Sequence, residues 1–96
     1  MFIGKVQVPD EWSKLVELIQ TQIPGQSSFN FQVGSTYSLQ VESGTVRVCN
    51  TNNAPTGLDG EHLSEDQFGI YEPDAGTLLV RAKPKTGVVL LSVSEL

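Results

Sequence analysis

The hydrophobic period changes once along the chain, and this change constrains the fold more than any other feature. Between Trp12 and Ile23, apolar residues recur three and four positions apart, as they do on one face of an α-helix. From Ser27 onward, apolar and polar residues alternate in short runs separated by Gly, Pro, Asn and Asp. This order predicts a mainly β domain, a small β-sandwich or barrel-like fold of six to seven antiparallel strands with one N-terminal amphipathic helix.

The helix is predicted over residues 10–22. Asp10 is the expected N-cap, and Pro24 with the glycine after it ends the helical pattern. Trp12 and Ile19 lie on the apolar stripe, so both are expected to be buried.

The strands are predicted from the period-two runs and from the turn residues between them. Their expected ranges are 2–8, 29–33, 37–41, 46–48, 68–70, 78–82 and 88–93. The runs 37–41 and 46–48, separated by Glu-Ser-Gly, form the best candidate for a β-hairpin.

The length and charge of the chain exclude several classes of protein. Ninety-six residues suffice for a single domain, 1–96, and the net charge of −5 argues against nucleic acid or an anionic membrane as a partner. No apolar run reaches the roughly 18 residues of a membrane span, and the first residues do not resemble a signal peptide. With a single cysteine, the protein is expected to be soluble in a reducing cytoplasm.

Catalytic, cofactor and metal chemistry find little support in the sequence. Cys49 is the only thiol and His62 the only imidazole, so neither a nucleophile with its base nor a zinc site is recognisable. His62 is expected on a solvated loop. The nearby cluster of Asp59, Glu61, Glu65 and Asp66 lacks the spacing of a calcium loop. We therefore expect a non-enzymatic protein without cofactor or metal.

The aromatic residues leave one alternative open, a carbohydrate- or ligand-binding β-sandwich. Trp12, Tyr37 and Tyr71 could stack against a sugar if they shared an exposed face. However, Trp12 lies on the helical stripe and Tyr37 is in phase with apolar neighbours, so both are expected in the core. Tyr71 is out of phase with Phe68 and Ile70 and is expected to be exposed.

The segment 50–61 is the predicted interface. It is long for so small a domain and rich in side chains that hydrogen-bond to backbone. The expected interface residues are Asn50, Asn52, Asn53, Pro55, Leu58 and Tyr71. The strand 2–8 is a second candidate, because its apolar residues need cover from its own sheet or from a neighbour.

A family resemblance begins at Thr-Val-Arg-Val-Cys-Asn, residues 45–50, which leads into Ala-Pro-Thr at 54–56. Phe-Gly-Ile-Tyr at 68–71 and Ala-Gly-Thr-Leu-Leu-Val-Arg-Ala at 75–82 follow before a final apolar strand. With the opening helix, this pattern resembles small β-rich virion proteins of tailed bacteriophages, of the capsid-decoration or head-fibre type.

The resemblance implies a virion structural protein that is made in the bacterial host cytoplasm and coats or extends a capsid or tail. Its implied partners are a capsid or other virion protein and further copies of itself, as a homo-oligomer. It implies no catalytic residue.

Overall fold

The computed structural model describes residues 1–50, 61–73, 78–82 and 89–96 of the chain, which form eight strands and one helix. In chain order these are β1 (Phe2–Gln7), β2 (Ser13–Lys14), α1 (Leu15–Gln22), β3 (Tyr37–Ser43), β4 (Val46–Cys49), β5 (Glu61–Leu63), β6 (Phe68–Tyr71), β7 (Leu79–Ala82) and β8 (Leu90–Glu95). The predicted mainly β class with one early helix is confirmed, with eight strands in place of six to seven.

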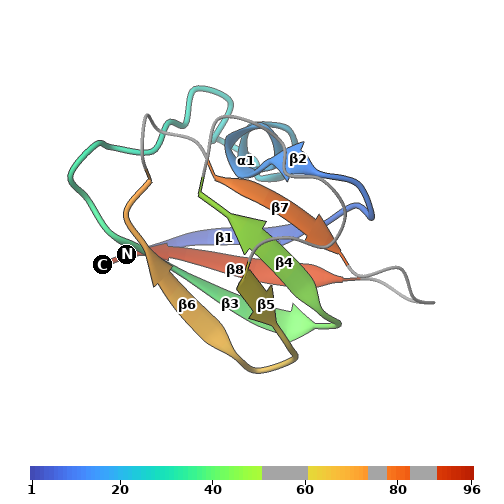
Figure 1. Cartoon of the computed structure of the whole chain (residues 1–96). Helices are drawn as coiled ribbons and strands as arrows, with labels where there is room; N and C mark the ends of the chain where they lie inside the picture. The colour runs from blue at the N-terminus through green and yellow to red at the C-terminus, as the bar shows by residue number, and fades with distance from the viewer. Residues whose placement is uncertain (51–60, 74–77, 83–88) are drawn as a thin grey trace.

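The strands form two layers packed against each other (Figure 1). The first sheet has the order β1-β8-β3-β6 and the second sheet the order β2-β7-β4-β5. Every neighbouring pair of strands is antiparallel. The chain ends lie at one corner of the first sheet, where the Met1 amino group donates a hydrogen bond to the Glu95 carbonyl.

The core lies between the sheets because alternate residues of each strand point inward. In β3, for example, Tyr37, Leu39 and Val41 are buried while Gln40 is exposed. The buried core residues are Ile3, Val6, Val8, Leu15, Ile19, Phe31, Tyr37, Leu39, Val41, Val46, Val48, Leu63, Leu78, Val80, Ala82, Val89, Leu91 and Val93. Each fully buried aliphatic side chain stabilises the fold by about 1.5–3 kcal/mol.

Helix α1 is shorter than predicted, because the residues before it run along β7. The two residues of β2 pair with β7, and the Leu15 N–H donates to the Leu78 carbonyl. These backbone hydrogen bonds hold the chain extended up to Lys14, so the helix begins at Leu15. The N-cap is Lys14, without a side-chain capping bond, and the prediction of Asp10 as N-cap was wrong.

The apolar stripe of α1 is confirmed, whereas the place of Trp12 is not. Leu15 and Ile19 are fully buried. Trp12 precedes the helix and is only half-buried, so its predicted position on the helical stripe was wrong.

The runs 37–41 and 46–48 are strands, but they do not form the predicted hairpin. β3 pairs with β6 and β8, whereas β4 pairs with β5 and β7, so the chain crosses from the first sheet to the second. The crossing occurs at Gly44, whose φ is +86° and whose Cα faces Val89 so closely that a Cβ would lie 2.7 Å from its Cγ2. A glycine is required there by both its backbone and its surroundings.

The predicted strand 29–33 is also wrong, because this segment consists of turns and irregular backbone. Its alternation nevertheless has a structural meaning. Phe31 is buried and packs edge-on against Tyr37, with ring centroids 4.8 Å apart, and Phe29 packs on Phe31 in the same way at 5.1 Å. These rings fasten the segment to the core without a strand ladder.

Candidate interaction surface

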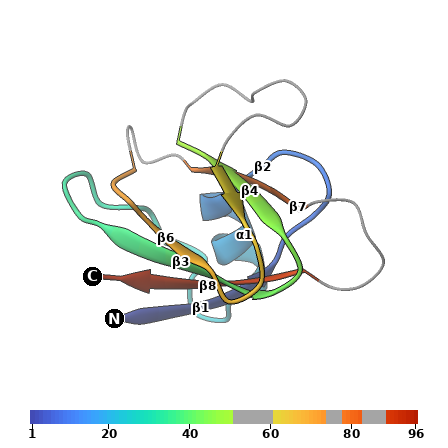
Figure 2. The ribbon, with the colours of Figure 1, turned by 60° about the horizontal axis from the view of Figure 1, so that its bottom comes forward.

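Helix α1 closes one side of the sandwich, between β1 and β2; we call this the closed side (Figure 2). Gln22, in the last turn of the helix, binds the backbone of β1 through both atoms of its amide. Its Oε1 accepts from the Gln7 N–H at 2.7 Å, and its Nε2 donates to the Gln7 carbonyl at 2.9 Å. The side chain thus occupies the backbone groups with which another strand would pair.

Three further features protect the outer edge of β1. The pairing of β1 with β8 shifts register between Phe2 and Gly4. Ile23 lies over Gly4, where a Cβ would be 2.5 Å from the Ile23 Cδ1 atom. Lys5 is exposed, with its Nζ 3.8 Å from Glu42 Oε1. Irregular register, a covering side chain and an edge lysine all oppose the addition of another strand.

The opposite side, which we call the open side, is formed by β6 of the first sheet and β5 of the second (Figures 1 and 2). None of the described strands pairs with the outer edge of β6 or of β5. An open groove of about 510 Å³ lies along this side. Its lining residues are Glu61, His62, Leu63, Asp66, Gln67 and Phe68.

A tight turn joins β5 to β6. The Gln67 N–H donates to the Ser64 carbonyl at 2.9 Å, and Asp66 has a φ of 68°. Asp66 also donates its N–H to the Val41 carbonyl at 2.8 Å, while the Val41 N–H donates to the Gln67 carbonyl at 2.9 Å. This is the pattern of a β-bulge with its first residue in the left-handed region, a position that glycine usually fills.

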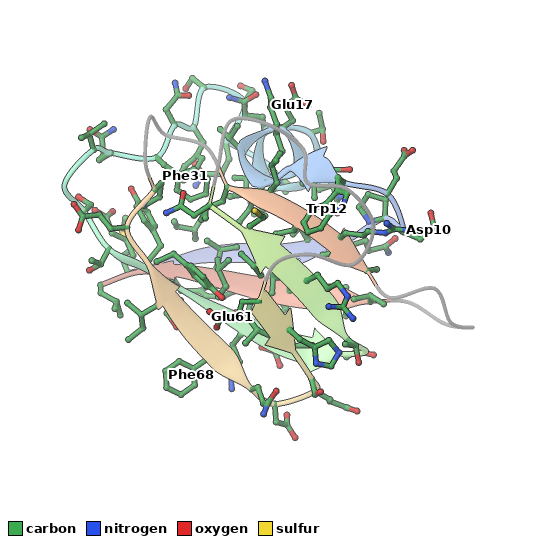
Figure 3. All side chains as sticks on the ribbon, viewed as in Figure 1. Asp10, Trp12, Glu17, Phe31, Glu61 and Phe68 are labelled. Carbon is green, nitrogen blue, oxygen red and sulfur yellow. The ribbon has the colours of Figure 1, made fainter. Side chains whose placement is uncertain are left out.

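The two faces of β6 are the reverse of what its sequence suggested. Phe68 and Ile70 are 60% and 57% exposed, while Gly69 is buried and Tyr71 half-buried. Figure 3 shows the Phe68 ring pointing away from the sandwich. The prediction that Tyr71 would be the exposed member of this strand was therefore wrong.

Tyr71 covers the inner face of β6. Its ring lies across Gly69, where a Cβ would be 2.5 Å from the Tyr71 hydroxyl oxygen. Burial raises the pKa of Tyr71 well above its ordinary value, and the nearby Glu61 carboxylate raises it further. The hydroxyl is buried and has no partner in hydrogen-bonding geometry among the described residues. Tyr71 therefore stays a neutral phenol up to a higher pH than an exposed tyrosine does.

The exposed large apolar side chains gather on the first sheet and the segments that flank it. They are Met1, Phe2, Val33, Phe68, Ile70 and Leu96. Among the described residues, neither the second sheet nor α1 contributes a large apolar side chain of this exposure. Several large apolar side chains exposed on one sheet are typical of a surface that another protein covers.

Two of the six predicted interface residues fall within the described part of the chain. Asn50 is exposed, and its Nδ2 donates to the Glu72 carbonyl at 2.8 Å, which places it beside the end of β6. Tyr71 ends the same strand and faces inward. The other four predicted interface residues lie outside the described residues; they are Asn52, Asn53, Pro55 and Leu58.

The second predicted interface, the strand 2–8, is largely covered by the chain itself. Ile3, Val6 and Val8 are buried in the core, and only Phe2 presents a large apolar side chain to solvent. Because Ile3, Val6 and Val8 face the core, these three side chains need no cover from a neighbouring protein.

The residues considered for chemistry are dispersed. Cys49 is half-buried on β4, and His62 is exposed on β5 rather than on the predicted loop. No group of three or more His, Cys, Asp or Glu within the described ranges could hold a metal ion. In the same part of the chain, no helix has the length and apolar character needed to cross a lipid bilayer.

The three aromatic residues of the carbohydrate alternative do not form an exposed platform. Tyr37 is buried, as predicted, and its hydroxyl accepts a hydrogen bond from the Gln32 N–H at 2.8 Å. Trp12, between β1 and β2, and Tyr71, at the end of β6, are both half-buried.

Comparisons with known proteins add no identification. No protein-family model matches the sequence, and neither the curated proteins nor the solved structures gave a match.

Proposed function

We propose that this chain is a non-enzymatic structural subunit of a tailed-bacteriophage virion, of the capsid-decoration or fibre-base type, that functions through protein–protein contacts. The observation that carries the proposal is that Phe2, Phe68 and Ile70 are exposed on the first sheet, whereas the described strands of the second sheet carry no large apolar side chain of that exposure. The resemblance of the sequence to small phage virion proteins supplies the kind of assembly.

The outer face of the first sheet suits contact with another protein surface. Between the exposed Phe2 on β1 and Ile70 on β6, the same row of the sheet carries Ser94 and Ser38. Short side chains between larger apolar ones leave a face that a second surface can approach closely. Apolar contacts at its margins would supply the binding energy, since burial of apolar area drives association.

The expected partners are a capsid or other virion protein and further copies of this chain. Symmetric contacts between copies would add stability to a domain whose own core is small. The net charge of −5 opposes binding to nucleic acid.

Co-sedimentation with phage particles tests the proposal. The purified chain should sediment with particles that lack it, and a Phe2→Ser, Phe68→Ser, Ile70→Ser triple variant should lose most of that association. A matched variant with Glu11→Ser and Glu17→Ser changes exposed residues away from the first sheet and should bind normally. If the native chain stays in the supernatant at every concentration, the virion proposal fails. Light scattering of the free chain measures the homo-oligomer.

A further inference from the structure

Backbone hydrogen-bonding groups of β6 face the open side, where none of the described strands pairs with them. Val41 of β3 exchanges hydrogen bonds with the 66–67 segment that leads into β6. Because backbone groups of an antiparallel strand alternate in direction, Gly69 also faces β3. The N–H and C=O groups of Phe68 and Ile70 therefore point to the outer edge, where no described strand takes them up.

Among the four edge strands of the sandwich, β6 is the least protected. The edge of β1 is covered by α1 and carries a lysine. β2 has only two residues and continues directly into the helix. β5 has three residues, of which Glu61 is charged. β6 is four residues long, apolar or aromatic apart from one glycine, and contains neither charge nor proline.

The surroundings of β6 specify what can bind there. Four exposed carboxylates flank the open side: Glu61, Glu65, Asp66 and Glu72. A strand added to β6 would place alternate side chains on the outer face, beside Phe68 and Ile70, and the others over the groove toward Glu61 and Asp66. The side chains beside Phe68 and Ile70 should therefore be apolar, and those over the groove should be lysine or arginine.

A second copy of β6 does not meet these requirements. Antiparallel self-pairing centred on Gly69 would place Asp66 opposite Glu72, and like charges directly opposite each other are destabilising. Centred on Ile70, it would place Phe68 opposite Glu72, and the β6 segment 64–73 has no lysine or arginine to bring toward Glu61 and Asp66. Charge complementarity therefore favours a different chain.

We propose that β6 is the docking edge for an extended segment of a partner protein, in which basic residues alternate with apolar ones. This segment joins the first sheet by backbone hydrogen bonds to Phe68 and Ile70, and its basic residues lie over Glu61 and Asp66. The inference rests on the proposed function, for which it names the surface and the chemistry of the partner.

Synthetic peptides test the inference on the whole chain. The probe is a capped hexapeptide of alternating lysine and valine, and the control is a hexapeptide with the same lysines and valines in two blocks. Titration followed by amide NMR should show tighter binding of the alternating peptide, with the largest shifts at Phe68, Ile70 and Glu61. Equal affinity of the two peptides, or shifts centred elsewhere, would overturn the inference.

Substitutions on β6 separate backbone pairing from general charge attraction. Ile70→Pro removes an N–H that faces the open edge and leaves the ladder with β3 in place, so it should weaken the alternating peptide about tenfold. Phe68→Lys places a positive charge on β6 that repels the lysines of the peptide. This variant replaces Ile70→Pro in the test if the proline variant does not fold. The matched control Val33→Lys changes an exposed apolar residue outside β6 and should bind as the native chain does. Native affinity in Phe68→Lys, or in a folded Ile70→Pro, refutes the docking edge.

The peptide experiment and the co-sedimentation experiment can have different outcomes, so each proposal can be refuted without the other. A chain that sediments with particles but does not discriminate between the peptides retains the virion proposal and loses the docking edge. A chain that binds the alternating peptide through β6 but ignores particles retains the docking edge in a different assembly.

Discussion

The two edges of the first sheet are built in opposite ways. At β1, a bidentate amide from Gln22 occupies the backbone, Ile23 covers Gly4, and Lys5 discourages pairing. At β6, two large apolar side chains are exposed, and none of the described strands pairs with the outer edge. The difference teaches that the edge of β1 owes most of its protection to residues outside the strand, Gln22 and Ile23, in addition to its own Lys5.

The largest expected effect on stability comes from a substitution at the edge of β1, where Gly4 lies against Ile23. Gly4→Val would place a branched side chain against Ile23 at a residue with a φ of 155°. Overpacking and backbone strain together should lower the free energy of unfolding by roughly 2–4 kcal/mol. Urea denaturation measures the change.

The matched substitution at the other edge is Gly69→Ala. The added Cβ would lie 2.5–2.8 Å from the Oη, Cε2 and Cζ atoms of Tyr71, so the phenol must shift, but unlike Gly4 this residue has no positive φ that would add backbone strain. The expected loss is about 1 kcal/mol. An equal loss at both glycines would show that the two edges are packed alike, which contradicts the comparison.

A smaller effect is expected when the amide that covers β1 is removed. Gln22→Ala deletes both hydrogen bonds to Gln7 at a solvent-accessible site, so stability should fall by about 1 kcal/mol. Gln22→Glu retains an acceptor for the Gln7 N–H and loses the donor, so its effect should be intermediate. Amide hydrogen exchange at Gln7 should accelerate in the alanine variant; unchanged exchange would mean that Gln22 does not protect the edge.

In the turn that leads into β6, one substitution should stabilise the domain instead of destabilising it. Asp66 holds a φ of 68°, which glycine adopts without steric cost. Asp66→Gly should therefore raise the free energy of unfolding by about 0.5 kcal/mol, after the entropy of a more flexible unfolded chain is subtracted. Asp66→Ala keeps a Cβ, loses the charge and should destabilise the domain. If glycine destabilises as alanine does, the turn differs from the one described.

The last prediction concerns pH on the open side. Since burial raises the pKa of Tyr71, the unfolded chain ionises first, near pH 10, while the folded chain keeps the neutral phenol. The free energy of unfolding is therefore unaffected by Tyr71 ionisation below about pH 10, and it falls as the pH rises further because the unfolded chain then loses the phenol proton more readily. Tyrosinate absorbance should show a late-titrating phenol that Tyr71→Phe removes and Glu61→Gln shifts part of the way back. A Tyr71 that titrates normally would mean that its ring does not pack over Gly69.

The strands were predictable from the sequence because alternation is a local property. The pairing between them was not. Tyr37, Leu39 and Val41 point to one core together with Val46, and both a hairpin and a crossing between sheets satisfy this pattern. The choice between them depends on β6 and β8, which pair with β3 from distant parts of the chain.

The open side was missed because both faces of β6 carry an apolar signal. The alternation of Phe68 and Ile70 is typical of a pair that faces the core. In the structure, the residues that face the core are Gly69, which has no side chain, and Tyr71, whose ring lies over Gly69. The carboxylates on both sides of this short apolar run were the available signal for an exposed strand. Helix α1 lost its first predicted turn for a comparable reason, since pairing with β7 outweighed local capping preferences.

The position of β8 in the first sheet has a consequence for folding kinetics. β8 pairs with β1 and with β3, so residues as distant as Phe2 and Ser94 must meet before the sheet can close. Pairings of such high contact order are slow, on the order of milliseconds to seconds. Among the described strands β1 pairs only with β8, so during synthesis it cannot join this sheet until β8 has left the ribosome. The sheet therefore assembles after translation of its interior strand, and rates of refolding should depend strongly on β8 and weakly on the early helix.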